Sequence, residues 1–209
     1  MVGGKLANGD RNDQRAHTGA KTNPMMSGVA ITRVATTGPD QSSYDYFYAH
    51  VDVVIVGAGI AGLLMTYELA KSGLNVLLVE QKHYLGGYAL SEDFEVNGVK
   101  APIWLEDIQK ELKKFDNVKI KQNFTAVGIH DHRYLIGFEN LEVDEKAGAS
   151  SIRHRLWRLR AQQIVLATGA IERPLIFAGN DIPGVMLSSA ALEFYKLYGV
   201  SPGDRIVLV

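Results

Sequence analysis

The chain has 209 residues, of which 46% are hydrophobic, and its 22 lysines and arginines nearly balance 23 aspartates and glutamates. This composition fits one globular domain with a core of ordinary size, and the net charge of -1 provides no long-range attraction to nucleic acid or to an anionic membrane. The complete lack of cysteine excludes disulfides, thiolate metal and iron–sulfur sites, and dithiol redox relays.

The N-terminal part, residues 1–43, is expected to be a flexible extension. Residues 1–23 are polar and glycine-rich and have no apolar period that could bury a face. From Met25 to His50 the apolar content rises, which suggests an arm that packs on the domain or on a partner. The N-terminus lacks the apolar stretch of a secretory signal, and no run in the chain approaches the roughly 18 apolar residues of a spanning helix. We therefore expect a cytoplasmic location.

The next stretch has the pattern of a Rossmann-type βαβ unit. Val51–Val56 is a β-branched run typical of a strand that is buried on both faces of a parallel sheet. A helix follows directly and stops at Gly73, and its apolar stripe is formed by Ile60, Leu63, Leu64 and Tyr67. Asn75–Val79 is predicted as the second parallel strand.

The loop Gly57–Gly62 between the first strand and the helix carries the GxGxxG pattern. Its first glycine permits a tight turn, the second lets the backbone approach a pyrophosphate, and the third lets the helix pack on the strand. The helix N-terminus points amides at the phosphates. A nucleotide-free glycine turn is the alternative interpretation.

Glu80 ends the second strand, about 20 residues after the loop, where a carboxylate accepts hydrogen bonds from a ribose and repels a 2′-phosphate. No arginine follows it in the sequence Gln81-Lys82-His83. NAD or FAD is therefore favoured over NADP as the cofactor.

Further elements follow in chain order. A crossover helix is predicted over about Ile103–Lys114, with one apolar face. Short alternating runs from Val118 to Arg160 predict an antiparallel β-meander, which Gln163–Thr168 closes as another buried strand. A last helix with an apolar stripe from Leu187 to Tyr198 ends at Gly199, and Arg205–Val209 is predicted as a strand that opens a second, incomplete nucleotide-binding unit.

These elements predict an α/β fold over residues 44–209: a Rossmann-type FAD/NAD(P)-binding domain with a parallel sheet, crossover helices and an antiparallel β-meander.

Other candidate positions have two interpretations each. Gly86 and Gly87 form either a turn or a close backbone approach to the cofactor. Thr168-Gly169 looks like the turn that returns beneath a dinucleotide in two-dinucleotide flavoproteins, or a plain strand end. His130-Asp131-His132 lies at a predicted hairpin tip with the acid facing away from the histidines, so no metal site is expected. No catalytic array stands out, so catalytic residues stay unassigned and redox chemistry is left to a bound cofactor.

Four stretches resemble the α subunit of heterotetrameric sarcosine oxidase and the related opine and cyanide-forming dehydrogenase subunits. They are VDVVIVGAGIAGL, VLLVEQKHYLGG, QIVLATGAIERPLIFAGNDIPGVMLSSAA and YGVSPGDRIVLV. In that family the α subunit holds NAD, the β subunit carries FAD and oxidises a secondary amine, and a flavin mononucleotide lies between them. The resemblance implies β-type and γ-type partner subunits, or self-association, and a small amine substrate that reaches the complex.

The resemblance also implies contacts at individual positions. Ala61 matches the loop contact to NAD, Glu80 to Lys82 match ribose-side contacts, Tyr88 matches the position after the double glycine, and Val127 matches an adenine-side backbone contact. Ile60 stands where the family usually has proline. The candidate cofactor-binding residues are Gly57, Gly59, Ile60, Ala61, Gly62, Glu80, Gln81, Lys82, Gly87, Tyr88, Val127, Thr168 and Gly169.

The leading interpretation is a dinucleotide-binding α-type subunit of an oxidoreductase complex, with NAD expected and FAD as the alternative. Two other interpretations stay open: a self-contained FAD/NAD-dependent oxidoreductase, and a non-catalytic NAD-binding assembly module.

Overall fold

The computed structural model describes residues 43–141 and 152–208. Its sheet contains β1 (Ser43–Val56), β2 (Val76–Val79), β5 (Val118–Lys121), β6 (Phe124–His130), β7 (Tyr134–Asn140) and β8 (Ile152–Leu166). The helices are α2 (Ile60–Lys71), α3 (Ala101–Leu112) and α4 (Ser188–Tyr198), and the short elements before α3 are the 3₁₀ turn η1 (Gly87–Leu90) and the hairpin of β3 (Glu95–Val96) and β4 (Val99–Lys100).

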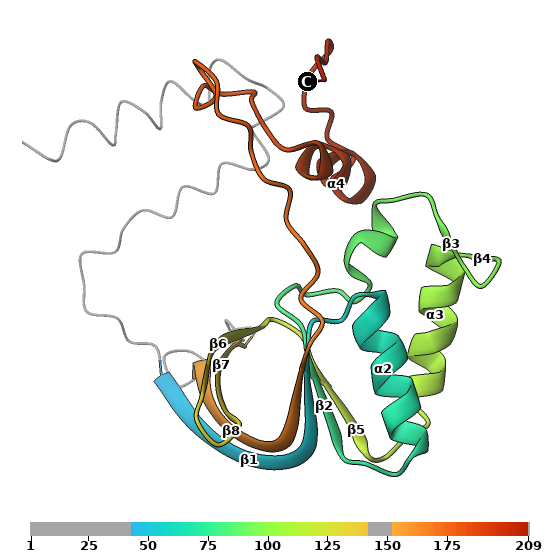
Figure 1. Ribbon diagram of the computed structural model, residues 1–209, viewed down its shortest axis with the longest axis vertical. Helices are drawn as coiled ribbons and strands as arrows, with labels where there is room; N and C mark the ends of the chain where they lie inside the picture. The colour runs from blue at the N-terminus through green and yellow to red at the C-terminus, as the bar shows by residue number, and fades with distance from the viewer. Residues whose placement is uncertain (1–42, 142–151, 209) are drawn as a thin grey trace, which may run out of the picture. The chain divides into compact units, whose positions relative to one another are not determined.

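Within the described ranges the main sheet is six-stranded, in the order β5-β2-β1-β8-β7-β6 (Figure 1). The pairs β5–β2, β2–β1 and β1–β8 are parallel, whereas β8–β7 and β7–β6 are antiparallel. The predicted α/β class, with a parallel sheet and an antiparallel meander, is therefore confirmed.

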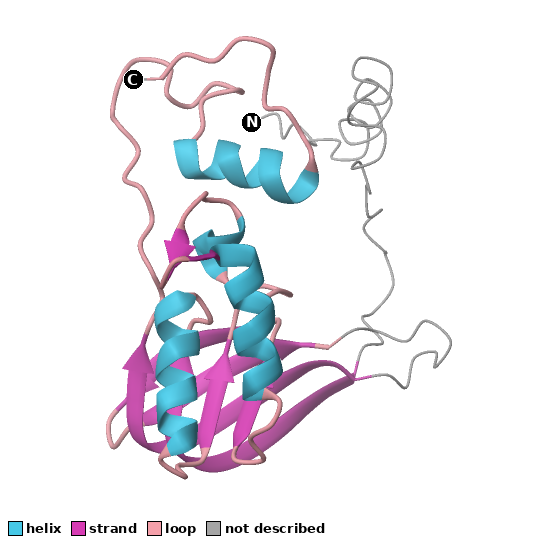
Figure 2. Ribbon diagram, turned by 90° about the vertical axis from the view of Figure 1, so that its right-hand side faces the viewer, coloured by secondary structure: helices cyan, strands magenta, loops and turns pink. Residues whose placement is uncertain are grey.

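The two central parallel strands, β1 at Val53–Val56 and β2, are buried on both faces, but against different layers. One face packs on α2 and α3, which lie together in front of the sheet in Figure 2, and its buried core includes Val53, Ile55, Leu63, Val76, Leu78, Leu105, Ile108 and Leu112. The alternate strand residues face the curled meander, and that core comprises Val54, Val56, Leu77, Val79, Phe124, Leu135, Trp157 and Leu159. Burial of each large apolar side chain contributes about 1.5–3 kcal/mol, which explains why these strands read as continuous apolar runs.

Local sequence signals mark the end of α2 and the start of α3. Gly73, with a φ of 77°, follows the end of α2, and its amide donates to Ala70 O at 3.0 Å. Pro102 lies in the first turn of α3, where a missing N–H costs no helical hydrogen bond. The expected helix at about Ile103–Lys114 is thus present, two residues earlier at each end.

Three strand predictions need correction. Val118–Lys121 is the third strand of the parallel half, paired with β2, and does not belong to the meander. The last run of the predicted meander, which ends at Arg160, and the separate strand predicted at Gln163–Thr168 belong to one strand, β8, because β1 continues alongside it from Ser43 to Val56. The predicted burial of Gln163–Thr168 is also wrong: β8 ends at Leu166, which is 63% exposed, and the buried side chains of β8, Trp157 and Leu159, lie in its first half.

The chain after α4 also differs from expectation. Arg205–Leu208 is not a strand, and its apolar side chains are largely exposed, with Val207 85% accessible. No strand of the described part pairs with it, and an isolated extended segment has no ladder of hydrogen bonds to hold it. Val209 and residues 1–42, including most of the expected N-terminal extension and arm, lie outside the described residues. Ser43–His50 of that arm is the first part of β1.

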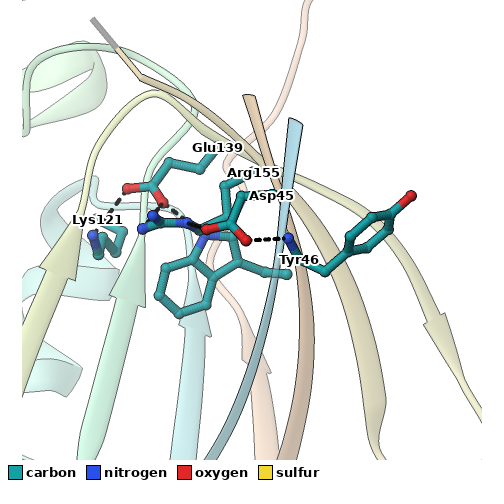
Figure 3. A network of polar contacts seen from close by, with 6 residues as sticks. Asp45, Tyr46, Lys121, Glu139 and Arg155 are labelled. Carbon is teal, nitrogen blue, oxygen red and sulfur yellow. Dashed lines mark hydrogen bonds and ion pairs between the residues drawn. The ribbon is translucent and has the colours of Figure 1, made fainter. Parts of the chain in front are cut away.

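A buried carboxylate joins the parallel half of the sheet to the meander (Figure 3). Glu139 on β7 is 4% exposed and accepts hydrogen bonds from Lys121 Nζ of β5 at 2.9 Å and from Trp157 Nε1 of β8 at 2.7 Å. Arg155 lies 3.9 Å from the same carboxylate and pairs with Asp45 of β1 at 3.0 Å. Because its oxygens are partnered, this buried charge has a structural role that fixes four strands against one another.

Candidate functional site

The glycine loop is packed tightly at its first and third glycines. Gly57 has a φ of 101°, and a Cβ there would lie 2.3 Å from the carbonyl oxygen of Ala167. A Cβ on Gly62 would lie 1.9 Å from the carbonyl oxygen of Gly57. These two glycines therefore let β1, β8 and α2 approach closely, as the sequence pattern predicts for a tight turn and for helix packing.

The second glycine differs from both. Gly59 is the N-cap residue of α2 and has a φ of -71° and a ψ of -174°, which any residue can adopt. A Cβ built on it would meet no atom within 4 Å. The protein's own packing does not require glycine here, and the open space lies at the helix N-terminus, where unpaired amides favour an anion.

Glu80 lies directly after β2, with its carboxylate turned to this loop. Its Oε2 accepts a hydrogen bond from the amide of Ala58 at 2.7 Å, and its Oε1 accepts one from the amide of Lys82 at 2.8 Å. Each carboxylate oxygen has two lone pairs, so each retains one acceptor site. Glu80 is therefore fixed by the backbone and can still accept hydrogen bonds from two hydroxyls.

A second glycine turn lies beside the first. The amide of Gly86 donates to Ala58 O at 2.8 Å, and Gly59 and Gly86 form a parallel β-bridge. A Cβ on Gly87 would come within 3.4 Å of Gly59 Cα. The double glycine thus lies beside the GxGxxG loop, which brings the sequence candidates Gly59 and Gly87 together.

The end of β8 completes the surroundings of the loop. The amide of Ala167 donates to Val56 O at 2.8 Å, so Thr168 and Gly169 follow the strand that borders the loop. Tyr88, on η1, donates its hydroxyl hydrogen bond to Ala170 O at 3.0 Å and so bridges the double-glycine turn and this strand end. Two segments that are 82 residues apart meet at this bridge, which no local sequence pattern indicates.

The remaining candidate residues lie on α2, after β2 and on β6. Ile60 and Ala61 begin α2, and Gln81 is exposed next to Glu80. Val127 lies on β6, and the Val127 side chain is 66% exposed. The first residue of β6, Phe124, donates its amide hydrogen bond to Glu80 O at 2.8 Å. Val127 is three residues further along the strand, or roughly 10 Å from that contact.

A polar cluster of Lys82, Tyr84 and Glu193 follows Glu80, and of its members only Lys82 was predicted from the sequence. Glu193 of α4 accepts hydrogen bonds from the ammonium of Lys82 and, at 2.7 Å, from the hydroxyl of Tyr84. Burial opposes the charge on Lys82, but its hydrogen bonds to Glu193 and Tyr84 outweigh that effect and raise its pKa. The hydrogen bonds from Lys82 and Tyr84 lower the pKa of Glu193. Burial raises the pKa of Tyr84 to about 12.

The histidine pair forms no metal site with a third ligand. Asp131 and His132 lie in the turn between β6 and β7, as expected for a hairpin tip. Across residues 43–141 and 152–208, no group of three or more histidine, cysteine, aspartate or glutamate residues is arranged to hold a metal ion.

Comparison with known proteins gives this geometry a context. Residues 55–110 match the family described as NAD(P)-binding Rossmann-like domain. The chain is 35% identical over 197 residues to the sarcosine oxidase α subunit of Corynebacterium sp. strain P-1, an alignment that covers 90% of this chain and 20% of that protein. Identity to the Rhizobium meliloti sarcosine oxidase α subunit is also 35%, over 181 residues, covering 86% of this chain and 18% of the relative.

The resemblance to sarcosine oxidase α subunits is thereby confirmed. The chain spans about a fifth of the length of these sarcosine oxidase α subunits. One of the opine oxidase subunits of Rhizobium meliloti is 26% identical over 161 residues, which cover 76% of this chain and 33% of that protein.

A solved structure shares the same architecture. The crystal structure of L-proline dehydrogenase from P. horikoshii superimposes with a TM-score of 0.61 at 29% identity, covering 76% of this chain and 31% of that one. The fold is therefore a Rossmann-type dinucleotide-binding fold of the kind found in oxidoreductases. Within the described residues, no helix is both long enough and apolar enough to cross a membrane.

Proposed function

We propose that the chain binds the ADP part of NAD, with FAD as the alternative, at the GxGxxG loop and Glu80. The observation that carries this proposal is the open space at Gly59, between two glycines that packing requires. A backbone that leaves room at the N-terminus of α2 can be approached closely by a pyrophosphate, which a side chain at that position would obstruct.

The residues around that space fit an adenine dinucleotide. The amides of Gly59 to Gly62 would bind the pyrophosphate, and the two free acceptor sites of the fixed Glu80 carboxylate would receive the ribose hydroxyls. When bound, NAD or FAD supplies the redox chemistry that the side chains lack. The protein's contribution is to bind and orient the cofactor.

We further propose that the chain acts as an α-type subunit, or part of one, in an oxidoreductase complex that oxidises a secondary amine. The similarity to sarcosine oxidase α subunits supports this role. Sarcosine and L-proline, the substrates in the names of the relatives, are both secondary amines. Amine oxidation itself is assigned to β-type and γ-type partner subunits. We also propose that the domain begins at residue 44 and that the protein is located in the cytoplasm.

The test has two stages. Calorimetric titration of the 209-residue chain should show saturable NAD binding and at least about tenfold weaker NADP binding. The chain alone should then consume no oxygen with sarcosine, and turnover should appear once a β-type partner is added. Saturable binding of FAD in place of NAD would select the alternative cofactor. Turnover by the chain alone would overturn the partner-dependent assignment and favour a self-contained flavoprotein.

A further inference from the structure

Helix α4 reaches the dinucleotide site through one acidic side chain. Glu193 contacts Lys82 and Tyr84, more than 100 residues earlier in the chain, and the Glu193 side chain is only 25% exposed. The other ion pair that joins α4 to the same body, Lys196 to Asp93 at 3.1 Å, is far more open, with the Asp93 side chain 92% exposed. No described side chain of α4 is fully buried.

Lys82 stands where a cation would alter cofactor choice. Its amide donates to Glu80 Oε1, so its side chain starts beside the carboxylate that would hold the ribose. A basic side chain next to this position is the usual means by which a Rossmann site accepts the additional 2′-phosphate of NADP. Lys82 therefore offers a charge that could offset the repulsion of a phosphate by Glu80.

We propose that Glu193 is a specificity-determining residue of this site, because it holds the Lys82 ammonium and so leaves Glu80 unopposed against a 2′-phosphate. The inference rests on the proposed dinucleotide site. It assigns the discrimination to two carboxylates from distant parts of the chain: Glu80 repels the phosphate, and Glu193 withholds the cation that would attract it.

The contacts favour this role over that of a simple anchor for α4. Tyr84 donates to Oε1 of Glu193, the oxygen that also receives Lys82, so the carboxylate is oriented towards the ammonium. The hydrogen bonds to Glu193 and Tyr84 raise the pKa of Lys82, so they favour the charged form of its ammonium. An anchor would need neither this orientation nor a position next to Glu80.

The experiment compares ADP-ribose with its 2′-phosphorylated form as probes, by calorimetry on the full chain. Both contain the ADP part that NAD and FAD share, so the result does not depend on which cofactor is native. Glu193→Gln keeps an acceptor for Tyr84 but removes the charge that holds Lys82. Asp93→Asn is the matched control, since it removes one negative charge and the other α4 ion pair but leaves Lys82 paired.

Glu193→Gln should raise the affinity for the 2′-phosphorylated probe relative to ADP-ribose by about five- to tenfold at low salt. Asp93→Asn should leave the ratio within about twofold, and adding Lys82→Met to Glu193→Gln should cancel the gain. An unchanged ratio in Glu193→Gln, or an equal rise in Asp93→Asn, would overturn the inference while the dinucleotide site stands. Failure of the unmodified chain to bind ADP-ribose would instead overturn the proposed function.

Discussion

Replacement of Gly59 by alanine separates binding from folding at this site. The backbone at Gly59 has a negative φ, so alanine introduces no strain, and its methyl group would enter a space with no protein atom within 4 Å. At the N-cap, alanine is somewhat less favourable than glycine, but it reduces the entropy of the unfolded chain by an offsetting amount. We therefore expect the free energy of unfolding to change by less than about 1 kcal/mol.

Cofactor binding should respond strongly to the same change. The added methyl group would occupy the approach of the pyrophosphate to the amides at the start of α2. A displacement of the phosphates from these donors should weaken NAD binding at least about tenfold, equivalent to about 1.4 kcal/mol.

The assay pairs calorimetric NAD titration with urea unfolding, and Gly62→Ala serves as the contrast. A Cβ on Gly62 would lie 1.9 Å from Gly57 O, so this variant must shift backbone and should lose about 1–3 kcal/mol of stability or more. If Gly59→Ala binds NAD as tightly as the unmodified chain does, the assignment of the pyrophosphate to this loop is wrong.

Three other predictions follow from described contacts. Glu80→Gln removes an acceptor for the ribose and for one fixed amide, so calorimetry should show about tenfold weaker NAD binding and a smaller preference over NADP; unchanged binding would contradict the role of Glu80. Glu139→Leu leaves Trp157 Nε1 without its acceptor and should lower the free energy of unfolding in urea by about 2–4 kcal/mol. Lys121→Met, at a partly exposed position, should lose less, and an equal loss there would argue against the buried indole as the cause. Hydrogen bonds from Lys82 and Tyr84 lower the pKa of Glu193 in the folded chain, so the contribution of Glu193 to stability is present above the unfolded carboxyl pKa of about 4.3 and is lost as pH falls through the lower folded value. In Glu193→Gln, the free energy of unfolding should therefore vary less with pH across that acidic range. Parallel pH profiles of the variant and the unmodified chain would contradict this.

The parallel core and the glycine loop could be predicted from sequence because their constraints are local. The apolar run before Gly57 and the carboxylate at Glu80 each depend on neighbours within one βαβ unit. The predicted apolar stripe of α2 is wrong at Leu64, which is exposed, because the buried face of the helix is formed by Gly62, Leu63, Thr66 and Ala70. The strand at Val118–Lys121 was wrongly assigned to the meander because its alternating side chains describe how its faces are buried but do not specify which strand it pairs with.

Contacts between residues far apart in the sequence could not be predicted. Tyr88 meets Ala170, and Lys82 meets Glu193, because β8 returns the chain to the loop edge after the meander. The spacing of these residues carries no signal, and only the sheet order brings them together. The same order explains why Ser43–His50 extends β1: the first half of β8 provides it with a parallel partner.

The central claim is the location of the dinucleotide site, and backbone amide chemical shifts during NAD titration test it most directly. For this 22.9 kDa chain, the account predicts that the largest saturable shifts fall on Gly59 to Gly62 and on Glu80 to Lys82, with smaller shifts at Gly87. Saturable shifts centred elsewhere, or no shifts at millimolar NAD or FAD, would contradict the account.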